Sequence, residues 1–237
     1  MAETTIEPTT APSAEGLLTT TRCVRRRLDL TRPVAREQIE HCVEVALQAP
    51  TGSYSQIARF ICVDDPERRA ALGEIYRKGW GVYEQTPLYA GGLPLEDPQL
   101  KAMMARGLRS AEHLVEHIHE APVLVIPCAD LAEGMGPAFI AAGYRRDAVQ
   151  PAVLQAAMWG SVMPAAWSFM LAARAGGLSS CWTVVHMFFE QEAAEVLGVP
   201  FESVIQAAMI PVGHTLGEGF HAGPRMPVGE AVHWDHW

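Results

Sequence analysis

Four arginines stand within six residues of an otherwise acidic chain. The segment RCVRRR covers residues 22–27 of a 237-residue sequence whose formal net charge is −9. A planar guanidinium donates parallel hydrogen bonds to two oxygens, so clustered arginines are suited to a phosphate group. A solvated basic surface would show the same composition. On composition alone, both interpretations stay open.

A second polar segment, APTGSYSQIARF (residues 49–60), contains more hydroxyl and amide groups than a plain connection needs. It follows REQIEHCVEVALQ, whose apolar residues recur at helical spacing, and it leads into FICVDD, a short apolar run typical of a buried strand. We therefore place it between a helix and a strand. It is either an ordinary polar loop or a loop that holds a polar ligand.

The histidines raise the question of metal or acid–base chemistry. His113, His117 and His119 form an H-x3-H-x-H pattern that would place two imidazoles one helical turn apart. No further ligand follows at a fixed spacing and glutamates surround the pattern, so we interpret it as a polar helix end and expect no metal. His186 is either a general acid or, as we favour, a hydrogen-bonded histidine at a strand end.

Familiar catalytic motifs do not occur in the sequence. GEGFHAG (residues 217–223) lacks the strand-to-helix context of a dinucleotide fingerprint, and there is neither a Walker lysine motif nor a G-x-S-x-G. No C-x-x-C pair occurs, which argues against a zinc site or a disulfide framework. Reduced thiols in a cytoplasmic protein are the simplest interpretation. The five cysteines are Cys23, Cys42, Cys62, Cys128 and Cys181.

The elements that must position these residues alternate between helices and short apolar strands. This order indicates a single α+β or α/β domain. We expect helices over residues 17–30, 35–48, 65–83, 100–120, 152–177 and 190–199, and strands over residues 59–65, 121–130, 179–186 and 204–214.

The N-terminal residues, two irregular segments and one apolar helix differ from the remaining elements. Residues 1–16 have the composition of a flexible leader, so the domain covers residues 17–237. Residues 84–110 and 131–150 include irregular, Gly- and Pro-rich stretches, and we expect one of them to form a lid. The helix over residues 152–177 is apolar nearly all round, which predicts burial in the core or between subunits.

Composition excludes several classes of partner. The acidic net charge argues against nucleic-acid binding, because no basic excess is available to neutralise phosphates. We expect no segment long and apolar enough to span a membrane, and the N-terminus does not have the pattern of a signal peptide. A cytoplasmic location is therefore expected.

Four segments, in order, resemble the flavin-dependent nitroreductase family over about residues 17–237. They are TTRCVRRRLDLTRPV, APTGSYSQ, LAARAGGLSSCW and MIPVGHTLGEGFHAGPRMPVGEAVHWDHW. The resemblance implies a three-layer α+β fold with a central, mostly antiparallel sheet flanked by helices. It also implies an entwined homodimer that holds two FMN molecules where the subunits meet.

Carried over by position, the resemblance implies a set of FMN-binding residues. Arg22 and Arg25 would approach the phosphate or the pyrimidine edge of the ring, and Arg225 would hold the phosphate. Cys23 stands where the family often has serine. The loop would come from the partner subunit, and the backbone at residues 183–184 would face flavin N5. The remaining implied residues are Pro50, Thr51, Gly52, Ser53, Tyr54, Gln56, Thr183 and Val184.

The implied function is that of an FMN-dependent oxidoreductase with a ping-pong mechanism. NADH or NADPH would pass hydride to flavin N5, and a small acceptor such as a nitroaromatic or a quinone would then take electrons. No catalytic residue beyond the flavin is implied, although Tyr54 could line the acceptor pocket.

The sequence departs from the family at three positions. Tyr54 replaces the usual asparagine, Ala58 stands where close relatives have tryptophan, and Met226 stands where they have lysine. These departures leave two alternatives open. One is a specialised flavin enzyme for dehydrogenation, dehalogenation or ring chemistry, and the other is a flavin-sequestering protein without turnover.

Overall fold

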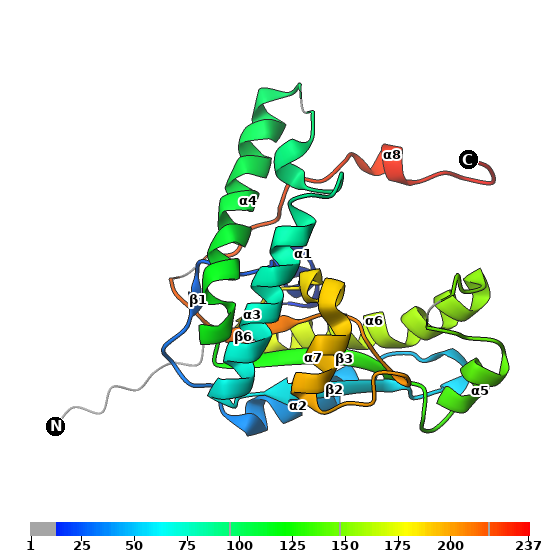
Figure 1. The fold of residues 1–237 in the computed structure, drawn as a ribbon. Coiled ribbons are helices and arrows are strands. Elements are labelled where there is room, and N and C mark those ends of the chain that lie inside the picture. The colour runs from blue at the N-terminus through cyan, green and yellow to red at the C-terminus, as the bar shows by residue number, and fades with distance from the viewer. Residues whose placement is uncertain (1–12, 95, 147, 218) are drawn as a thin grey trace.

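A six-stranded antiparallel sheet lies between two layers of helices (Figure 1). The computed structural model describes residues 13–94, 96–146, 148–217 and 219–237. The main strand order is β1-β6-β3-β2, with β4 paired to β6 and β5 paired to β3. The strands are β1 (Leu28–Asp29), β2 (Ala58–Val63), β3 (Val123–Asp130), β4 (Leu178–Ser180), β5 (Val204–Gln206) and β6 (Ile210–Thr215).

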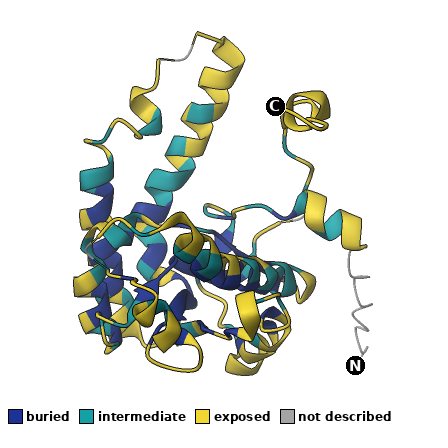
Figure 2. Ribbon diagram, turned by 90° about the vertical axis from the view of Figure 1, so that its right-hand side faces the viewer, coloured by how far each residue is buried: buried dark blue, intermediate teal, exposed yellow. Residues whose placement is uncertain are grey.

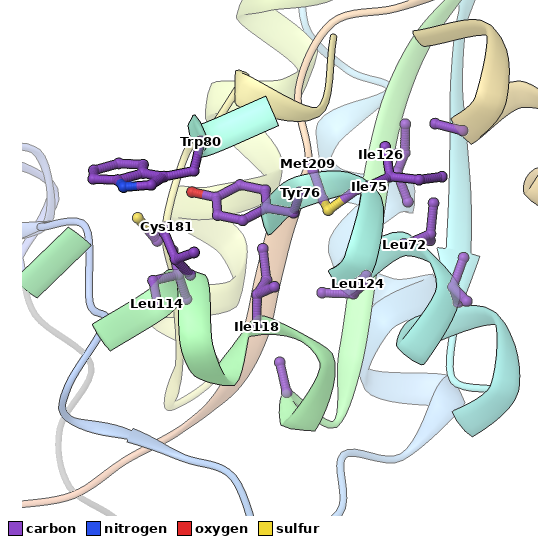
Figure 3. Close-up of a cluster of buried hydrophobic side chains, with 14 of the residues drawn as sticks. Leu72, Ile75, Tyr76, Trp80, Leu114, Ile118, Leu124, Ile126, Cys181 and Met209 are labelled. Atoms are coloured by element: carbon purple, nitrogen blue, oxygen red, sulfur yellow. The ribbon is translucent and has the colours of Figure 1, made fainter. Parts of the chain in front are cut away.

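Strand β3 is buried on both faces and separates two hydrophobic cores. Side chains alternate along a strand, so neighbouring residues enter opposite layers. Leu124 and Ile126 pack into the core under α3 and α4, where Leu72 also lies (Figure 3). Val123 and Val125 pack into the other core, under α2 and α6. The apolar run in this part of the sequence therefore belongs to a central strand of a three-layer fold.

The helices divide between the two faces of the sheet. On one face lie α3 (Pro66–Tyr83), α4 (Pro98–His117) and α7 (Glu190–Leu197), and on the other lie α2 (Arg36–Ala46) and α6 (Ala152–Ala175). The shorter helices are α1 (Ala14–Thr20), α5 (Gly136–Ala141), α8 (Val228–Ala231), η1 (Gly52–Tyr54), η2 (Ala90–Gly92), η3 (Ile118–Glu120) and η4 (Val185–Phe189).

Helices α3 and α4 extend side by side beyond the sheet, and the far end of this hairpin is exposed (Figures 1 and 2). Each begins in the same way: an aspartate side chain accepts a hydrogen bond from the first turn, and proline occupies the next position. The Asp65 carboxylate accepts from Arg68 N at 2.8 Å, and the Asp97 carboxylate accepts from Gln99 N at 2.8 Å.

The predicted fold class is confirmed, whereas the predicted first helix is wrong. A helix covers only Ala14–Thr20, and the chain then continues in an extended form. Cys23 makes a parallel bridge with Ser180, and the Val24 N–H donates to the Ser180 carbonyl oxygen at 2.9 Å. Pairing with a strand far along the chain thus overrides the local helical spacing, and the arginines of residues 22–27 do not share a helix face.

Two predicted strands are shorter than expected. The strand over residues 179–186 ends at Ser180, and the chain turns into η4 at Val185. The strand over residues 204–214 is two strands, β5 and β6, which pair with different parts of β3. An apolar run does not reveal such a break, because both halves are equally buried. Residues 131–150 contain α5 within the expected irregular segment, and residues 1–12 of the expected leader lie outside the described residues.

The expectation that no segment is long and apolar enough to span a membrane is wrong. Helix α6 passes that test of length and composition, which the core helices of soluble proteins also pass. Its inner face packs in the core through residues such as Phe169 and Met170. Its outer face exposes Val153, Met163 and Trp167. The helix is therefore part core and part exposed apolar surface.

The contact between α3 and η4 depends on a glycine. A Cβ atom at Gly79 would lie well inside the contact distance of the Val185 carbonyl oxygen, whereas a Cβ at Gly81 would meet nothing within 4 Å. We expect Gly79→Ala to lower the free energy of unfolding by about 1–3 kcal/mol, because helix and loop must separate. Gly81→Ala, on the same helix, should raise it by about 0.5–1 kcal/mol.

Urea denaturation of the two variants and the wild type checks this prediction. Equal stability of Gly79→Ala and Gly81→Ala would contradict the close packing of α3 on η4.

Candidate functional site

A pocket of about 630 Å³ opens between α3, α4 and the segment around η4. We call it the aromatic pocket. Tyr76, Trp80 and Tyr83 come from one side of α3, and the Trp80 and Tyr83 rings lie 5.3 Å apart. Its other lining residues include Arg25, Leu88, Met104, Leu108, Trp182, Thr183, Val184 and Phe188. A cavity of this size and lining suits a planar organic molecule.

A second pocket, of about 390 Å³, shares Arg25 with the aromatic pocket. We call it the basic pocket. Its wall contains all four arginines of RCVRRR, and it is completed by Cys23, Val24, Ser110, Gly219, Phe220 and His221. Because Arg25 lines both pockets, the cationic and the aromatic surfaces are continuous. The segment after β6 thus meets the segment before β1.

Arg22 and Arg225 converge at the edge of the basic pocket, next to Gly223. A methyl group at Gly223 would lie 3.0 Å from Nη1 of Arg225 and 3.4 Å from Nη2 of Arg22. Among the described residues, both side chains donate only to nearby backbone carbonyls: Arg22 to Thr19 and Thr21 at 2.7 Å, and Arg225 to Pro224 at 2.8 Å.

No carboxylate among the described residues forms an ion pair with either Arg22 or Arg225. Two guanidinium groups that converge without a carboxylate repel each other, and an anion bound between them would remove that cost. These residues therefore fit a phosphate group.

Sequence reasoning missed Arg174, which lies with Arg27 around the Phe220 ring. The guanidinium carbon of Arg174 lies 3.9 Å from the centroid of the Phe220 ring, and that of Arg27 lies 5.1 Å from it. Arg27 also donates to the carbonyls of Leu216 and Gly219. Burial, and to a lesser degree Arg27, lowers the pKa of Arg174. Arg174 lies within LAARAGG, one of the segments that resemble the family. Its position there was the signal from which it could have been predicted as a site residue.

The predicted residues Arg25, Thr183 and Val184 all line the aromatic pocket. Thr183 is held by backbone hydrogen bonds with Met209, at 3.2 Å and 2.9 Å. Close by, burial raises the pKa of the Tyr76 phenol to about 12, although the Thr183 hydroxyl opposes the shift. The phenol is therefore neutral at physiological pH.

The predicted loop lies elsewhere in the chain. Ser161, buried on α6, accepts a hydrogen bond from Gly52 N at 3.0 Å and lies 3.3 Å from the Ser55 hydroxyl. Of the described residues, none from the loop lines the aromatic or the basic pocket. The loop residues that this placement separates from the pockets are Pro50, Thr51, Gly52, Ser53, Tyr54 and Gln56.

The loop backbone is unusual for its sequence. Ser53, Tyr54 and Gln56 have φ values of 50°, 56° and 46°, in the left-handed region that favours glycine and asparagine. Tyr54 is 80% exposed. An asparagine, the residue usual for the family, would suit this conformation better than the tyrosine does.

The other two departures have different surroundings. Ala58 is buried in β2, opposite Ala129, and so does not face either pocket. Met226 is exposed, next to Arg225 on the C-terminal arm (residues 221–237).

Two of the predicted histidines lie among glutamates at the end of α4, and His186 is buried. Ligand atoms of His113, Glu116 and His117 lie within 4.8 Å of one another, and His117 Nδ1 lies 2.8 Å from Glu120 Oε1. The prediction that they hold no metal stays a prediction. The favoured interpretation of His186 as a residue at a strand end is wrong, because it lies in η4; it is fully buried, and although the Gln206 side chain lies beside it, neither ring nitrogen meets strict hydrogen-bond geometry with a described residue.

The sequence profile of the nitroreductase family matches residues 18–214. The chain belongs to the nitroreductase family. Arg225 lies beyond the matched range, so the profile does not account for its position beside Arg22. No curated protein sequence matches significantly.

Solved structures confirm the fold at low sequence identity. A BluB-like flavoprotein from Clostridium difficile 630 has a TM-score of 0.66 and 16% identity, with 94% of this chain and 99% of that chain covered. NADPH:FMN oxidoreductase from Vibrio harveyi in complex with NAD+ has a TM-score of 0.64 and 17% identity, with 93% of this chain and 76% of that chain covered. Iodotyrosine deiodinase bound to FMN and 3-iodo-L-tyrosine has a TM-score of 0.63 and 18% identity, with 93% of this chain and 97% of that chain covered.

The buried His186 predicts a pH dependence of stability. Burial lowers its pKa to about 4, and the Gln206 amide opposes this only in part. The unfolded chain therefore takes up a proton before the folded chain does. The stabilisation is complete above about pH 6.5 and is lost as the pH falls toward 4, by about 3 kcal/mol in total.

Urea denaturation at pH 7 and pH 4.5 checks this, with His186→Leu as the comparison because leucine does not titrate. The wild type should lose more free energy of unfolding between the two pH values than the variant does. Equal losses would show that His186 is protonated in the folded chain.

Proposed function

We propose that this chain is an FMN-dependent oxidoreductase that moves hydride from NADH or NADPH through the flavin to a small acceptor such as a nitroaromatic or a quinone. The observation that carries the proposal is the convergence of Arg22 and Arg225 beside a pocket with aromatic walls. Membership of the nitroreductase family supports it.

The chain's own residues would divide the work between binding and orientation. Arg22 and Arg225 would bind the phosphate by charge-assisted hydrogen bonds. Arg25, which lines both pockets, would place a positive charge at the pyrimidine edge of the ring and favour its anionic reduced form. The backbone at Thr183 and Val184 would face the N5 side.

FMN itself would supply the hydride chemistry by accepting hydride from the nicotinamide and passing electrons to the second substrate. The aromatic pocket would exclude water and stack a planar acceptor, with the segment 84–110 as its outer wall. That segment contributes Leu88, Met104 and Leu108 to the lining, whereas no described residue of the segment 131–150 does so. A lid role for residues 84–110 is accordingly part of the proposal.

A second copy of the chain would complete the site. The loop of residues 50–56 does not reach the pockets of its own chain, and Tyr54 is exposed. The outer face of α6 exposes Val153, Met163 and Trp167. We therefore propose a cytoplasmic homodimer in which each chain supplies this loop to the site of the other.

The C-terminal arm supports the same arrangement. It leaves the body of the chain (Figures 1 and 2), and Trp234 and Trp237 are 80% and 97% exposed. Exposed aromatic side chains on an extended arm suit a partner surface.

A specialised reaction on the same scaffold is the second candidate. Aromatic side chains dominate the α3 wall of the pocket, and Arg25 is the one charged residue among the described residues of its lining. This combination suits an aromatic substrate as well as a quinone. Iodotyrosine deiodinase, a structural neighbour, binds such a substrate together with FMN. Dehalogenation or another flavin reaction would use the same residues.

The absorbance spectrum tests these alternatives. A yellow preparation that NADH or NADPH bleaches anaerobically, and that a quinone or nitroaromatic restores, supports the first proposal. Parallel lines in double-reciprocal kinetic plots would support the ping-pong order. A yellow protein that no nicotinamide bleaches would indicate sequestration or another reductant. A colourless protein that takes up no added FMN would contradict all the flavin functions.

Removal of Arg225 should weaken FMN binding. Loss of a charge-assisted hydrogen bond predicts about a tenfold to hundredfold rise in the FMN dissociation constant for Arg225→Ala. Fluorescence quenching of added FMN measures it. Arg109→Ala is the matched control, because Arg109 is an exposed arginine of α4 that lines neither pocket. Equal dissociation constants for the two variants would remove Arg225 from the site.

A further inference from the structure

Two cysteines lie near each other, one in the wall of the basic pocket and one in the core behind it. Cys23 is exposed there, and its bridge to Ser180 places it beside the next residue, Cys181. Cys181 is fully buried, in the core that also contains Tyr76 and Leu114 (Figure 3). Cys23 therefore lies at the pocket surface with its sulfur partly covered, and Cys181 lies in the dry core.

Their environments give the two thiols opposite acidities. A side-chain hydrogen bond from Cys181 is the main cause that lowers the pKa of Cys23 to about 6, with further contributions from the Trp182 backbone and the charge of Arg25. Burial opposes this shift. The same hydrogen bond, together with burial, raises the pKa of Cys181 well above its usual value. These shifts favour the thiolate at Cys23 and the thiol at Cys181, whose Sγ also lies 3.7 Å from the Trp182 carbonyl oxygen as a donor.

Cys62 provides a comparison within the same chain. It is also exposed, on β2, but burial of its sulfur and the nearby charges of Asp64 and Glu40 raise its pKa to about 11. Both residues are thus exposed. Of the two, Cys23 has a nearby arginine and a thiol partner, whereas Cys62 has nearby carboxylates. Thiolate character and access together determine how fast a cysteine is oxidised or alkylated.

We propose that Cys23 and Cys181 form a redox-active dithiol, in which Cys23 reacts with hydroperoxides and Cys181 then closes an intramolecular disulfide. The geometry supplies both partners: a cysteine in the wall of a pocket lined by arginines, and a second thiol on the residue that follows its bridge partner Ser180. A lone cysteine would have no such second step. This proposal does not depend on flavin chemistry, although both use the basic pocket.

The reaction balances without a cofactor. The Cys23 thiolate attacks one oxygen of the hydroperoxide, the O–O bond breaks, and the alkoxide or hydroxide that leaves takes up a proton. The resulting Cys23 sulfenic acid is attacked by the Cys181 sulfur. The S–S bond forms, the S–O bond breaks, and the leaving hydroxide combines with the Cys181 proton to give water. In total, two thiols are oxidised by two electrons and one peroxide is reduced.

Alkylation rates test the first part. The purified full-length chain is treated with iodoacetamide from pH 5 to pH 9, and modification of each cysteine is followed by peptide mass spectrometry. Cys23 should reach half of its maximal rate near pH 6, and Cys62 should react far more slowly throughout. Cys181→Ala, which removes the donor, should move the midpoint for Cys23 upward, whereas Cys181→Ser, which keeps a donor, should move it less.

Oxidation tests the second part. After stoichiometric hydrogen peroxide and maleimide quenching, a non-reduced digest of the wild type should contain a linked Cys23–Cys181 peptide. Cys181→Ser should yield a dimedone adduct at Cys23 and no link, and Cys62→Ser should behave as the wild type. Absence of the linked peptide, or equal reactivity of Cys23 and Cys62, would overturn the proposal.

An arm with excess FMN separates this inference from the proposed function. FMN bound in the basic pocket should slow the alkylation of Cys23 at least several-fold and leave Cys62 unchanged. No protection by FMN, with the linked peptide still formed in its absence, would contradict the flavin site while leaving the dithiol in place.

Discussion

The candidate site depends on one backbone contact, the pairing of Cys23 with Ser180 at the end of β4. It holds residues 21–24 extended before the chain turns at residues 25–27, so that the arginines face different directions instead of sharing one helix face. Arg22 is thereby directed toward Gly223 and Arg225, while Arg25 lines both pockets. The same contact places the Cys23 thiol against Cys181. Two segments that are far apart in the sequence become one surface.

Electrostatics explains why this surface differs from the rest of the chain. With a formal charge of −9, the protein has ample carboxylates to neutralise its arginines, and it does so elsewhere: Arg36 pairs with Asp64, and Arg146 pairs with Glu190. Among the described residues, no carboxylate forms an ion pair with Arg22 or Arg225. Uncompensated cations that gather at a pocket are costly unless an anion occupies it, which is the physical argument for a phosphate ligand.

Much of the fold could be predicted from the sequence, because local patterns and tertiary packing agree there. The apolar run of β3 and the spacing of Leu72, Ile75 and Tyr76 in α3 correspond to the observed core. The first helix could not be predicted correctly, since the extended form of residues 21–24 depends on β4, more than a hundred residues away. Likewise, nothing local indicates that Ser53 and Tyr54 adopt positive φ values.

For the site, residue types gave partial information. Clustered arginines indicated an anion, and the resemblance added Arg225, but the role of Arg174 and Phe220 depends on the return of the chain after β6. The aromatic wall was also hidden, because the helical spacing of Tyr76 and Trp80 is equally typical of a core-facing helix. Periodicity shows which face of a helix is apolar. It does not show whether that face meets a neighbour or borders a cavity.

The most direct test of the central claim compares the affinities of the purified protein for FMN and for riboflavin, which differ in the phosphate alone. If Arg22 and Arg225 form a phosphate site, FMN should bind at least about a hundredfold more tightly, and the difference should shrink as salt is added. Equal affinities for the two flavins, at low and high salt alike, would contradict the claim that these arginines converge to bind a phosphate.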